Sequence, residues 1–257
     1  YAKENFIGGR RPKFVYFGGG TPSYLSESQL RELTDGMKEL LPWDEVEEVT
    51  FECEPGTLRE KKLKILHEIG VTRLSLGVEN FDDHILELNG RAHRGPEIGR
   101  AYEFAQGLGF PQINIDLIAG MVEETEENWK ACIERTREMA PDSVTIYQME
   151  VPYNTGIYQQ MKADGKLSAP VADWDTKRRW VNDAYTALEQ DGYTVSSAYT
   201  AVKDKARTSF VYRDRLWAGA DLLSLGVASF GHIGGTHYQN LHDFAPYIEC
   251  IDRGGLP

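Results

Sequence analysis

Cysteine is scarce in this sequence. Its 257 residues include three cysteines, Cys53, Cys132 and Cys250, which are far apart and form no CxxC pair. Distant cysteines in an odd number are typical of reduced thiols and exclude a disulfide framework. Their spacing also matches no common metal site, so we assign no metal ligand among them.

Two further absences limit the possible functions. There is no run of about 18 apolar residues and no visible secretory signal, although the chain begins with Tyr1 rather than Met. Basic residues are outnumbered, with 28 Lys and Arg against 40 Asp and Glu and a net charge of −12. This balance excludes a general nucleic-acid surface. We therefore expect a cytoplasmic protein with no membrane span and no nucleic-acid partner.

Short apolar runs alternate with amphipathic helical stretches over the first 150 residues. The runs predict strands over residues 14–17, 46–53, 71–78, 113–120 and 143–151. Five consecutive strand–helix steps predict an α/β fold with a parallel sheet and right-handed crossovers, closed into a full or partial barrel. The strands are mostly apolar, as expected where both faces of a sheet are covered.

Residues 151–180 break this rhythm with polar residues, Gly and Pro. We therefore expect a barrel core over residues 1–150. Residues 151–257 would form the last barrel units and an appended C-terminal α+β layer on the substrate side, with an incomplete C-terminus.

Polar residues recur where the predicted strands end. They are Gly18, Gly19, Gly20 and Thr21 after the first strand, Glu52 and Glu54 at the second, Glu79 and Asn80 at the third with Arg91 beyond it, Asn114 and Asp116 on the fourth, and Tyr147, Gln148 and Glu150 on the fifth. Each alone has an ordinary explanation, such as a carboxylate that nearby amides satisfy. Recurrence at five strand ends favours a ligand site, because parallel α/β folds bind ligands at that edge.

The residue types at this edge predict the chemistry of the ligand. Backbone N–H groups around the glycines suit a carboxylate or an amino-acid group. Glu52 and Asp116 suit an ammonium group or ribose hydroxyls, and Arg91 suits a carboxylate. A ligand that combines an amino acid with a ribose fits this set.

Four stretches carry a family resemblance: FGGGTPSYLS (17–26), FECEPGTL (51–58), RLSLGVENFDDHILELNGRAH (73–93) and INIDLIAGM (113–121). On these motifs the sequence resembles the radical S-adenosylmethionine (SAM) proteins. Within them it is similar to the oxygen-independent coproporphyrinogen III oxidase family of porphyrin biosynthesis, which includes haem chaperones. The resemblance implies a partial (β/α)6 radical SAM barrel.

The resemblance also implies roles for residues at the strand ends. Gly19, Gly20 and Thr21 would contact the methionine part of SAM, Arg91 its carboxylate, Glu52 its polar groups and Asp116 its ribose hydroxyls, while Ile118 and Glu150 would line the adenosyl pocket. Glu79 stands where the oxidase usually carries glutamine, and it adds a negative charge beside the site. No catalytic residue is assigned. The assignment requires Gly20, Glu52, Arg91 and Asp116 to converge on one cavity.

The implied cofactors are SAM and a [4Fe–4S] cluster. The family binds its cluster through CxxxCxxC, upstream of the GGGTP strand, and this sequence contains no such motif. We therefore expect the first strand, the cluster loop and its ligand cysteines in an N-terminal segment that is missing here. An electron donor such as flavodoxin or ferredoxin is implied as a partner.

The predicted function is that of a radical SAM oxidoreductase. It would cleave SAM to a 5′-deoxyadenosyl radical that acts on a tetrapyrrole-like or other bulky substrate. Two alternatives remain open: a haem-binding chaperone of the same family without turnover, and a radical SAM C-methyltransferase or cyclopropanase.

Overall fold

A seven-stranded sheet organises the chain, in the order β1-β2-β3-β4-β5-β7-β6, and a separate hairpin pairs β8 with β9. The computed structural model describes residues 2–153, 156–165 and 171–257. The strands are β1 Phe14–Phe17, β2 Glu48–Cys53, β3 Arg73–Glu79, β4 Gln112–Ala119, β5 Ser143–Gln148, β6 Thr194–Val195, β7 Thr200–Val202, β8 Phe230–Ile233 and β9 Thr236–Gln239. Strands β1 to β5 pair in parallel in chain order, which confirms the predicted parallel α/β fold.

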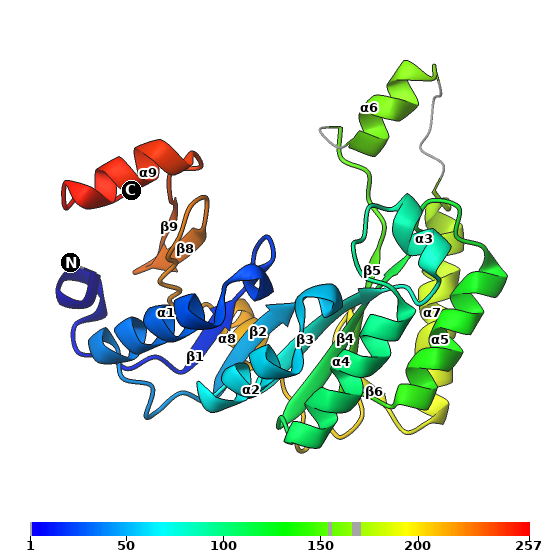
Figure 1. Cartoon of the computed structure of the whole chain (residues 1–257), viewed down its shortest axis with the longest axis horizontal. Helices are drawn as coiled ribbons and strands as arrows, with labels where there is room; N and C mark the ends of the chain where they lie inside the picture. The colour runs from blue at the N-terminus through cyan, green and yellow to red at the C-terminus, as the bar shows by residue number, and fades with distance from the viewer. Residues whose placement is uncertain (1, 154–155, 166–170) are drawn as a thin grey trace.

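Helices α1 Glu27–Leu40, α2 Glu60–Glu68, α4 Gly95–Leu108 and α5 Glu126–Met139 connect the parallel strands across one face of the sheet. The other helices are α3 Asp83–Leu88, α6 Gly156–Ala163, α7 Trp174–Gln190, α8 Val211–Trp217 and α9 Phe244–Asp252, and helical turns lie at Lys3–Ile7, Pro22–Tyr24 and Pro55–Thr57. Figure 1 shows α1, α2, α4 and α5 together in front of the sheet. Side-chain caps fix where two of these helices begin: Ser26 accepts from the N–H of Gln29, and Thr125 from the N–H of Asn128, each at 3.2 Å.

The C-terminal part of the chain also contributes to the main sheet. Strand β7 pairs antiparallel with β5, and β6 pairs antiparallel with β7. Helix α6 stands away from the sheet, while the β8–β9 hairpin and α9 lie near the N-terminus at the β1 side (Figure 1). The division at residue 150 stays a prediction, and residues 154–155 and 166–170 lie outside the described residues.

Side chains along the parallel strands alternate between an apolar and a polar face. The buried apolar set, which belongs to the hydrophobic core, includes Val49, Phe51, Cys53, Leu74, Leu76, Ile113, Ile115, Leu117, Val144 and Ile146. The residues between them are Glu48, Thr50, Glu52, Arg73, Ser75, Gln112, Asn114, Asp116, Ser143 and Thr145. Successive side chains of a strand point to opposite faces, so the polar set faces away from the core helices. Most of this polar set is buried too, so both faces of the sheet are covered, but the second face is polar.

Asn114 connects three strands on the polar face. Its Nδ2 donates to Ser75 Oγ at 3.0 Å and to Asp116 Oδ1 at 2.9 Å. Its Oδ1 accepts from Ser143 Oγ at 2.8 Å and from Thr145 Oγ1 at 3.0 Å. These four bonds use the full donor and acceptor capacity of the amide, so the network fixes β3, β4 and β5 relative to one another.

Helix α8 covers the polar face near β1 and β2. The carboxylate of Glu48 accepts from the N–H groups of Val211 at 2.8 Å and Tyr212 at 3.1 Å, at the start of the helix. The ring of Tyr212 stacks on that of Tyr16 with centroids 4.0 Å apart. These contacts attach the segment after β7 to the first two strands.

We predict that truncation of the core side of β4 destabilises the fold. Ile115 is fully buried, so Ile115→Ala should lower the free energy of unfolding by about 2–5 kcal/mol through lost burial and a residual cavity. The matched control is Ile248→Ala on α9, where the side chain is 54% exposed, and it should cost less than about 0.5 kcal/mol. Denaturant unfolding measures both values, and equal losses would contradict the assigned core face.

Candidate functional site at the strand ends

The turn after β1 contains three glycines, and each is constrained by the backbone or by its surroundings. Gly19 and Gly20 have φ angles of 76° and 57°, in the left-handed region that disfavours other residues. A Cβ on Gly18 would lie 2.3 Å from the ring of Tyr16 and 3.0 Å from the carboxyl group of Glu52. The turn therefore brings backbone N–H groups close to a carboxylate on the neighbouring strand.

Glu52, on the polar face of β2, receives two hydrogen bonds. The N–H of Gly19 donates to Oε2 at 3.2 Å, and the hydroxyl of Tyr16 donates to Oε1. Burial, followed by the charge of Glu52, raises the pKa of Tyr16 well above its usual range, so this hydroxyl remains a donor. Glu52 is half-buried and keeps lone pairs free for a ligand.

Glu79 ends β3 in a strained conformation. Its φ angle is 64°, and the β3–β4 register shifts between Gly77 and Glu79. Its Oε1 lies 3.3 Å from Arg91 Nη1, and a Cβ on Gly77 would lie 3.2 Å from the same oxygen. Burial raises the pKa of Glu79 to about 7, with Arg91 opposing and the charges of Asp116 and Glu52 adding to the rise. Near neutral pH this side chain is thus divided between its charged and neutral forms.

Asp116 lies opposite Gly77 on β4 and is held by side-chain donors. Ser75 Oγ donates to its Oδ2 at 2.8 Å, and Asn114 Nδ2 donates to its Oδ1 at 2.9 Å. Burial raises the pKa of Asp116, and the charge of Arg73 is the largest opposing influence. The fixed orientation presents a carboxylate whose geometry does not depend on the ligand.

These side chains form one electrostatic group, here named the strand-end cluster: Glu52, Glu79, Arg91 and Asp116. The charges of Arg91, Asp116 and Glu52 all act on Glu79. The structure thus brings together four of the predicted residues, and Gly19 joins them through its N–H.

Two tyrosines lie beside the cluster: Tyr147 is predicted at the end of the fifth strand without an assigned role, and Tyr16 is not predicted at the site. Tyr16 bonds directly to Glu52. Tyr147 continues the polar face of β5, and burial, then the charges of Asp116 and Glu52, raise its pKa to about 12. The signal for Tyr147 in the sequence is the two-residue alternation of Ser143, Thr145 and Tyr147 along the strand.

The remaining predicted residues lie around the cluster. Gly20 is exposed. Thr21 is the first residue of the next turn, and its carbonyl accepts a hydrogen bond from the N–H of Tyr24 at 3.0 Å. Ile118 is half-buried and pairs with Tyr147 in the β4–β5 register. Glu150 is exposed beyond β5, and its charge acts on Lys177 rather than on the cluster.

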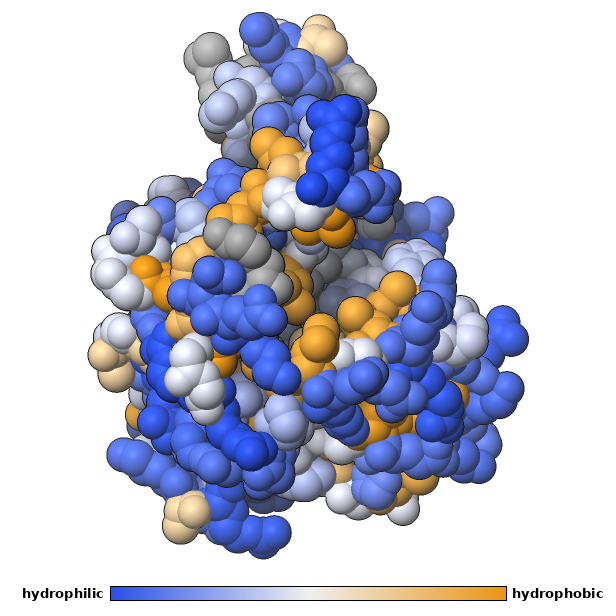
Figure 2. All heavy atoms as spheres, turned by 90° about the vertical axis from the view of Figure 1, so that its left-hand side faces the viewer, coloured by the Kyte–Doolittle hydropathy of each residue, from blue (hydrophilic) through white to orange (hydrophobic). Residues whose placement is uncertain are grey.

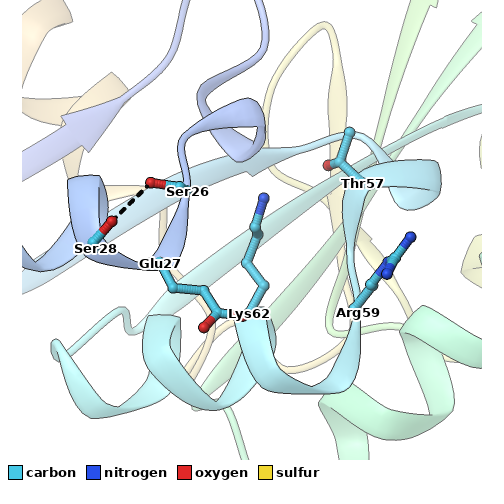
Figure 3. A pocket seen from close by; sticks show the side chains of 6 residues that line it. All are labelled: Ser26, Glu27, Ser28, Thr57, Arg59 and Lys62. Atoms are coloured by element: carbon cyan, nitrogen blue, oxygen red, sulfur yellow. Dashed lines mark hydrogen bonds between the residues drawn. The ribbon is translucent and has the colours of Figure 1, made fainter.

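Two cavities lie away from the cluster. One, of about 450 Å³, opens between the start of α1 and the start of α2 and is lined by Ser26, Glu27, Ser28, Thr57, Arg59 and Lys62 (Figure 3). The other, of about 220 Å³, lies where β3, β4 and β5 begin. Neither is lined by the cluster, so convergence of the site residues on one cavity stays a prediction.

The cysteines of the chain do not form a cluster site. Cys53 and Cys132 are buried, Cys250 is half-buried, and all three thiols are free. Burial raises the pKa of the Cys53 and Cys132 thiols above their usual range, which disfavours the thiolate that binds iron. Within the described residues, no group of three or more His, Cys, Asp and Glu side chains is placed to hold a metal ion. These residues therefore do not fit a [4Fe–4S] cluster.

A family model described as the radical SAM superfamily matches residues 3–136. The chain is 30% identical to the heme chaperone HemW of Bacillus subtilis over 95% of this chain and 64% of that protein. It is 26% identical to the oxygen-independent coproporphyrinogen III oxidase of Escherichia coli over 96% of this chain and 55% of that protein. The solved structure of E. coli coproporphyrinogen III oxidase covers 96% of this chain with a TM-score of 0.83 at 24% identity, and this chain covers 58% of it. The structural match confirms the predicted fold class, and the chain spans about 55–64% of these relatives.

We predict that Glu79→Gln removes part of the pH dependence of stability. The pKa of Glu79 rises from its ordinary 4.5 to about 7 on folding, so between these values the folded state binds more protons than the unfolded chain. The free energy of unfolding then falls as the pH rises through this window. Glutamine resembles the neutral acid, so the variant should be more stable by on the order of 2–3 kcal/mol above pH 7 and equal near pH 4.

Denaturant unfolding of both proteins across this pH range measures the difference. Glu124, whose pKa is also raised to about 7, is present in both proteins and cancels in the comparison. Parallel pH profiles for the wild type and Glu79→Gln would contradict the assigned burial of Glu79.

Proposed function

The chain belongs to the radical SAM superfamily, and from this premise we propose that it is an oxidoreductase of the oxygen-independent coproporphyrinogen III oxidase-like group, acting on a tetrapyrrole-like or other bulky substrate. The superfamily's cofactors are SAM and a [4Fe–4S] cluster, and SAM cleavage supplies a 5′-deoxyadenosyl radical that abstracts hydrogen from the substrate. The observation that carries the proposal is the strand-end cluster, where Arg91 lies 3.3 Å from Glu79 and the charges of Asp116 and Glu52 also act on Glu79, at the edge of a parallel sheet where ligands bind.

The donor and acceptor set of this edge fits SAM. Gly19 and Gly20 leave backbone open for the methionine part, and Thr21 follows them. Arg91 has a side chain 38% exposed, so guanidinium donors beyond its contact with Glu79 remain for the methionine carboxylate. Asp116, oriented by Ser75 and Asn114, is proposed to accept from the ribose hydroxyls.

The remaining assigned residues complete the proposed site. Glu52 keeps lone pairs for the polar groups of SAM, while Ile118 and Glu150 are proposed to line the adenosyl part. Glu79 adds a negative charge to the site when it is ionised. SAM carries two positive groups, a sulfonium and an ammonium, and this charge attracts them. A positive group near Glu79 stabilises its carboxylate, so we expect SAM binding to release a proton from it near pH 7.

A broad apolar surface supports a bulky substrate. Figure 2 faces the side of the molecule that carries the N-terminus, the β8–β9 hairpin and α9, and hydrophobic residues gather around a hollow in the middle of that face. The exposed large apolar side chains of the C-terminal part include Phe230 at 69% and Phe244 at 74%. Apolar exposure on this scale is typical of an interaction surface.

A second candidate is a haem chaperone of the same group that binds SAM without turning a substrate over. The observation that favours it is the higher identity to HemW, 30%, than to the coproporphyrinogen oxidase, 26%. The carboxylate of Glu79, where the oxidase usually carries glutamine, favours it as well. Both candidates use the same strand-end cluster, and they differ in whether SAM is consumed.

Partners and location form part of the proposal. A one-electron donor of the flavodoxin or ferredoxin type is proposed because reductive cleavage of SAM needs an electron. None of the helices in the described residues is long and apolar enough to cross a bilayer. A cytoplasmic location is proposed with this in view.

We predict that Arg91→Met weakens SAM binding by about 10- to 100-fold, because a charge-assisted hydrogen bond to the methionine carboxylate is lost. Isothermal titration calorimetry with SAM measures the dissociation constant. The matched control is Arg100→Met, which removes an exposed arginine of α4 and should bind SAM like the wild type. Equal affinity of the Arg91→Met variant and the wild type would contradict the assigned site.

We predict that the full-length protein, in a form that carries the CxxxCxxC cluster motif, converts SAM to 5′-deoxyadenosine when its cluster is bound and reduced by dithionite. Anaerobic reconstitution with iron and sulfide, followed by product analysis, measures this conversion. Haem uptake without formation of 5′-deoxyadenosine would contradict the oxidoreductase function and support the haem-chaperone function. Formation of S-adenosylhomocysteine would instead indicate methyl transfer.

A further inference from the structure

A polar cavity of about 220 Å³ lies at the end of the sheet opposite the strand-end cluster. Its lining combines Arg73, Gln112 and Ser143, which begin β3, β4 and β5, with residues of the segment 196–214 that carries β7 and leads into α8. Arg73 begins β3 and Glu79 ends it, so the cavity opens toward the amino ends of the strands. No cluster residue lines the cavity, although the charge of Arg73 acts on Asp116 of the cluster.

Arg73 is 2% exposed, yet its guanidinium lacks the partners that burial requires. Its buried Nε has no hydrogen-bond partner. Among the described residues, Asp116, Glu48, Tyr16 and Tyr147 act on its charge from a distance, with no side-chain hydrogen bond among these influences. A guanidinium stays charged and carries five N–H donors, so burying it unpaired costs several kcal/mol.

The nearest carboxylates are already engaged elsewhere. The charges of Asp116 and Glu48 act on Arg73 from a distance. Glu48 accepts from the N–H groups of Val211 and Tyr212 and from Thr50 Oγ1. Asp116 accepts from Ser75 and Asn114, as described above. Neither carboxylate is left to pair with Arg73.

The aromatic contact of Arg73 does not replace those partners. Its Cζ lies 3.9 Å from the ring centroid of Phe210. A cation–π contact of this kind stabilises the charge but accepts no hydrogen bond from the N–H groups at the guanidinium edge. These donors therefore need oxygen acceptors inside the cavity.

The remaining lining favours an anion. Lys205 adds positive charge, while Arg213 and Asp214 lie 2.7 Å apart as an ion pair and add no net charge. The hydroxyl-bearing residues Thr200 and Thr208 are 3% and 7% exposed and line the same space. In a chain of net charge −12, such a cationic cavity is a local feature rather than a general one.

We propose that this cavity binds a small oxyanion of the phosphate class, which accepts hydrogen bonds from Arg73 and from the hydroxyls of Thr200 and Thr208. The lining donors come from three elements, β3, β7 and the loop after β7, so an anion with several acceptor oxygens can bond to all of them. The anion joins the segment 196–214 to the starts of the parallel strands.

The pocket in Figure 3 provides an internal comparison. It also contains cations, Arg59 and Lys62, but Arg59 is exposed and the amine of Lys62 already donates to the carbonyl of Ser23. No buried donor there lacks a partner among the described residues. We therefore expect no specific anion binding at that pocket.

The proposal is tested on the purified protein with inorganic phosphate as the probe, at constant ionic strength with chloride as the exchanged anion. Phosphate should bind saturably in isothermal titration calorimetry. At about ten times the dissociation constant it should raise Tm by roughly 3–5 °C. Arg73→Met should abolish the saturable rise, Arg73→Lys should retain part of it, and the matched control Arg59→Met should behave like the wild type.

A second readout separates this role from a purely structural one. Without phosphate, Arg73→Met should be as stable as the wild type or more stable, because an unpaired buried charge is removed. With saturating phosphate the wild type should be more stable than Arg73→Met. Thr208→Val, which keeps Arg73, should weaken binding if the first variant does not fold. The proposal would be overturned if the wild type showed no saturable phosphate binding, as expected of a water-filled cavity. It would also be overturned if phosphate raised the Tm of the wild type and of Arg73→Met equally.

Discussion

Each parallel strand presents its side chains alternately to the helices and to the opposite face, and the rest of this structure depends on that alternation. On the helix side, Phe51, Leu76 and Ile115 are fully buried and belong to one continuous core. On the other side the same strands carry carboxylates, amides and hydroxyls. A shift of one residue in any strand would exchange the two sets, so the core also fixes the position of the polar groups.

The polar face is stable because nearly every group on it has a partner. Asn114 uses its full hydrogen-bonding capacity, and Asp116 and Glu48 are each held by neutral donors. The exceptions lie at the two ends of the strands. At the carboxyl ends the strand-end cluster concentrates negative charge around Glu79, and at the amino ends Arg73 is buried without an acceptor. At both ends a bound ligand would supply what is missing, which is positive charge near Glu79 and hydrogen-bond acceptors near Arg73.

The parallel sheet could be predicted from the sequence because apolar runs and amphipathic stretches repeat in a fixed order. Gly19, Glu52 and Asp116 could be placed at one edge because parallel strands end there. Tyr16 could not be assigned to the site in the same way, because it stands in a four-residue aromatic and apolar strand whose side chains have no evident face until α8 packs on one of them.

The C-terminal part was harder to predict for a related reason. Strands β6 and β7 are two and three residues long, and they form because β7 pairs with the free edge of β5 and β6 pairs with β7. Arg73 begins an apolar strand and looks like an ordinary surface cation in the sequence. Its burial requires Phe210, which is more than a hundred residues away. Such contacts follow from tertiary packing and leave no local pattern.

The central claim is that the edge formed by the glycine turn and the strand-end cluster holds SAM. A crystal structure of the protein grown with SAM tests this most directly. The account predicts that the methionine part lies against Gly19 and Gly20 with its carboxylate on Arg91, and that the ribose hydroxyls contact Asp116. Well-defined SAM bound elsewhere on the protein, with this edge free, would contradict it.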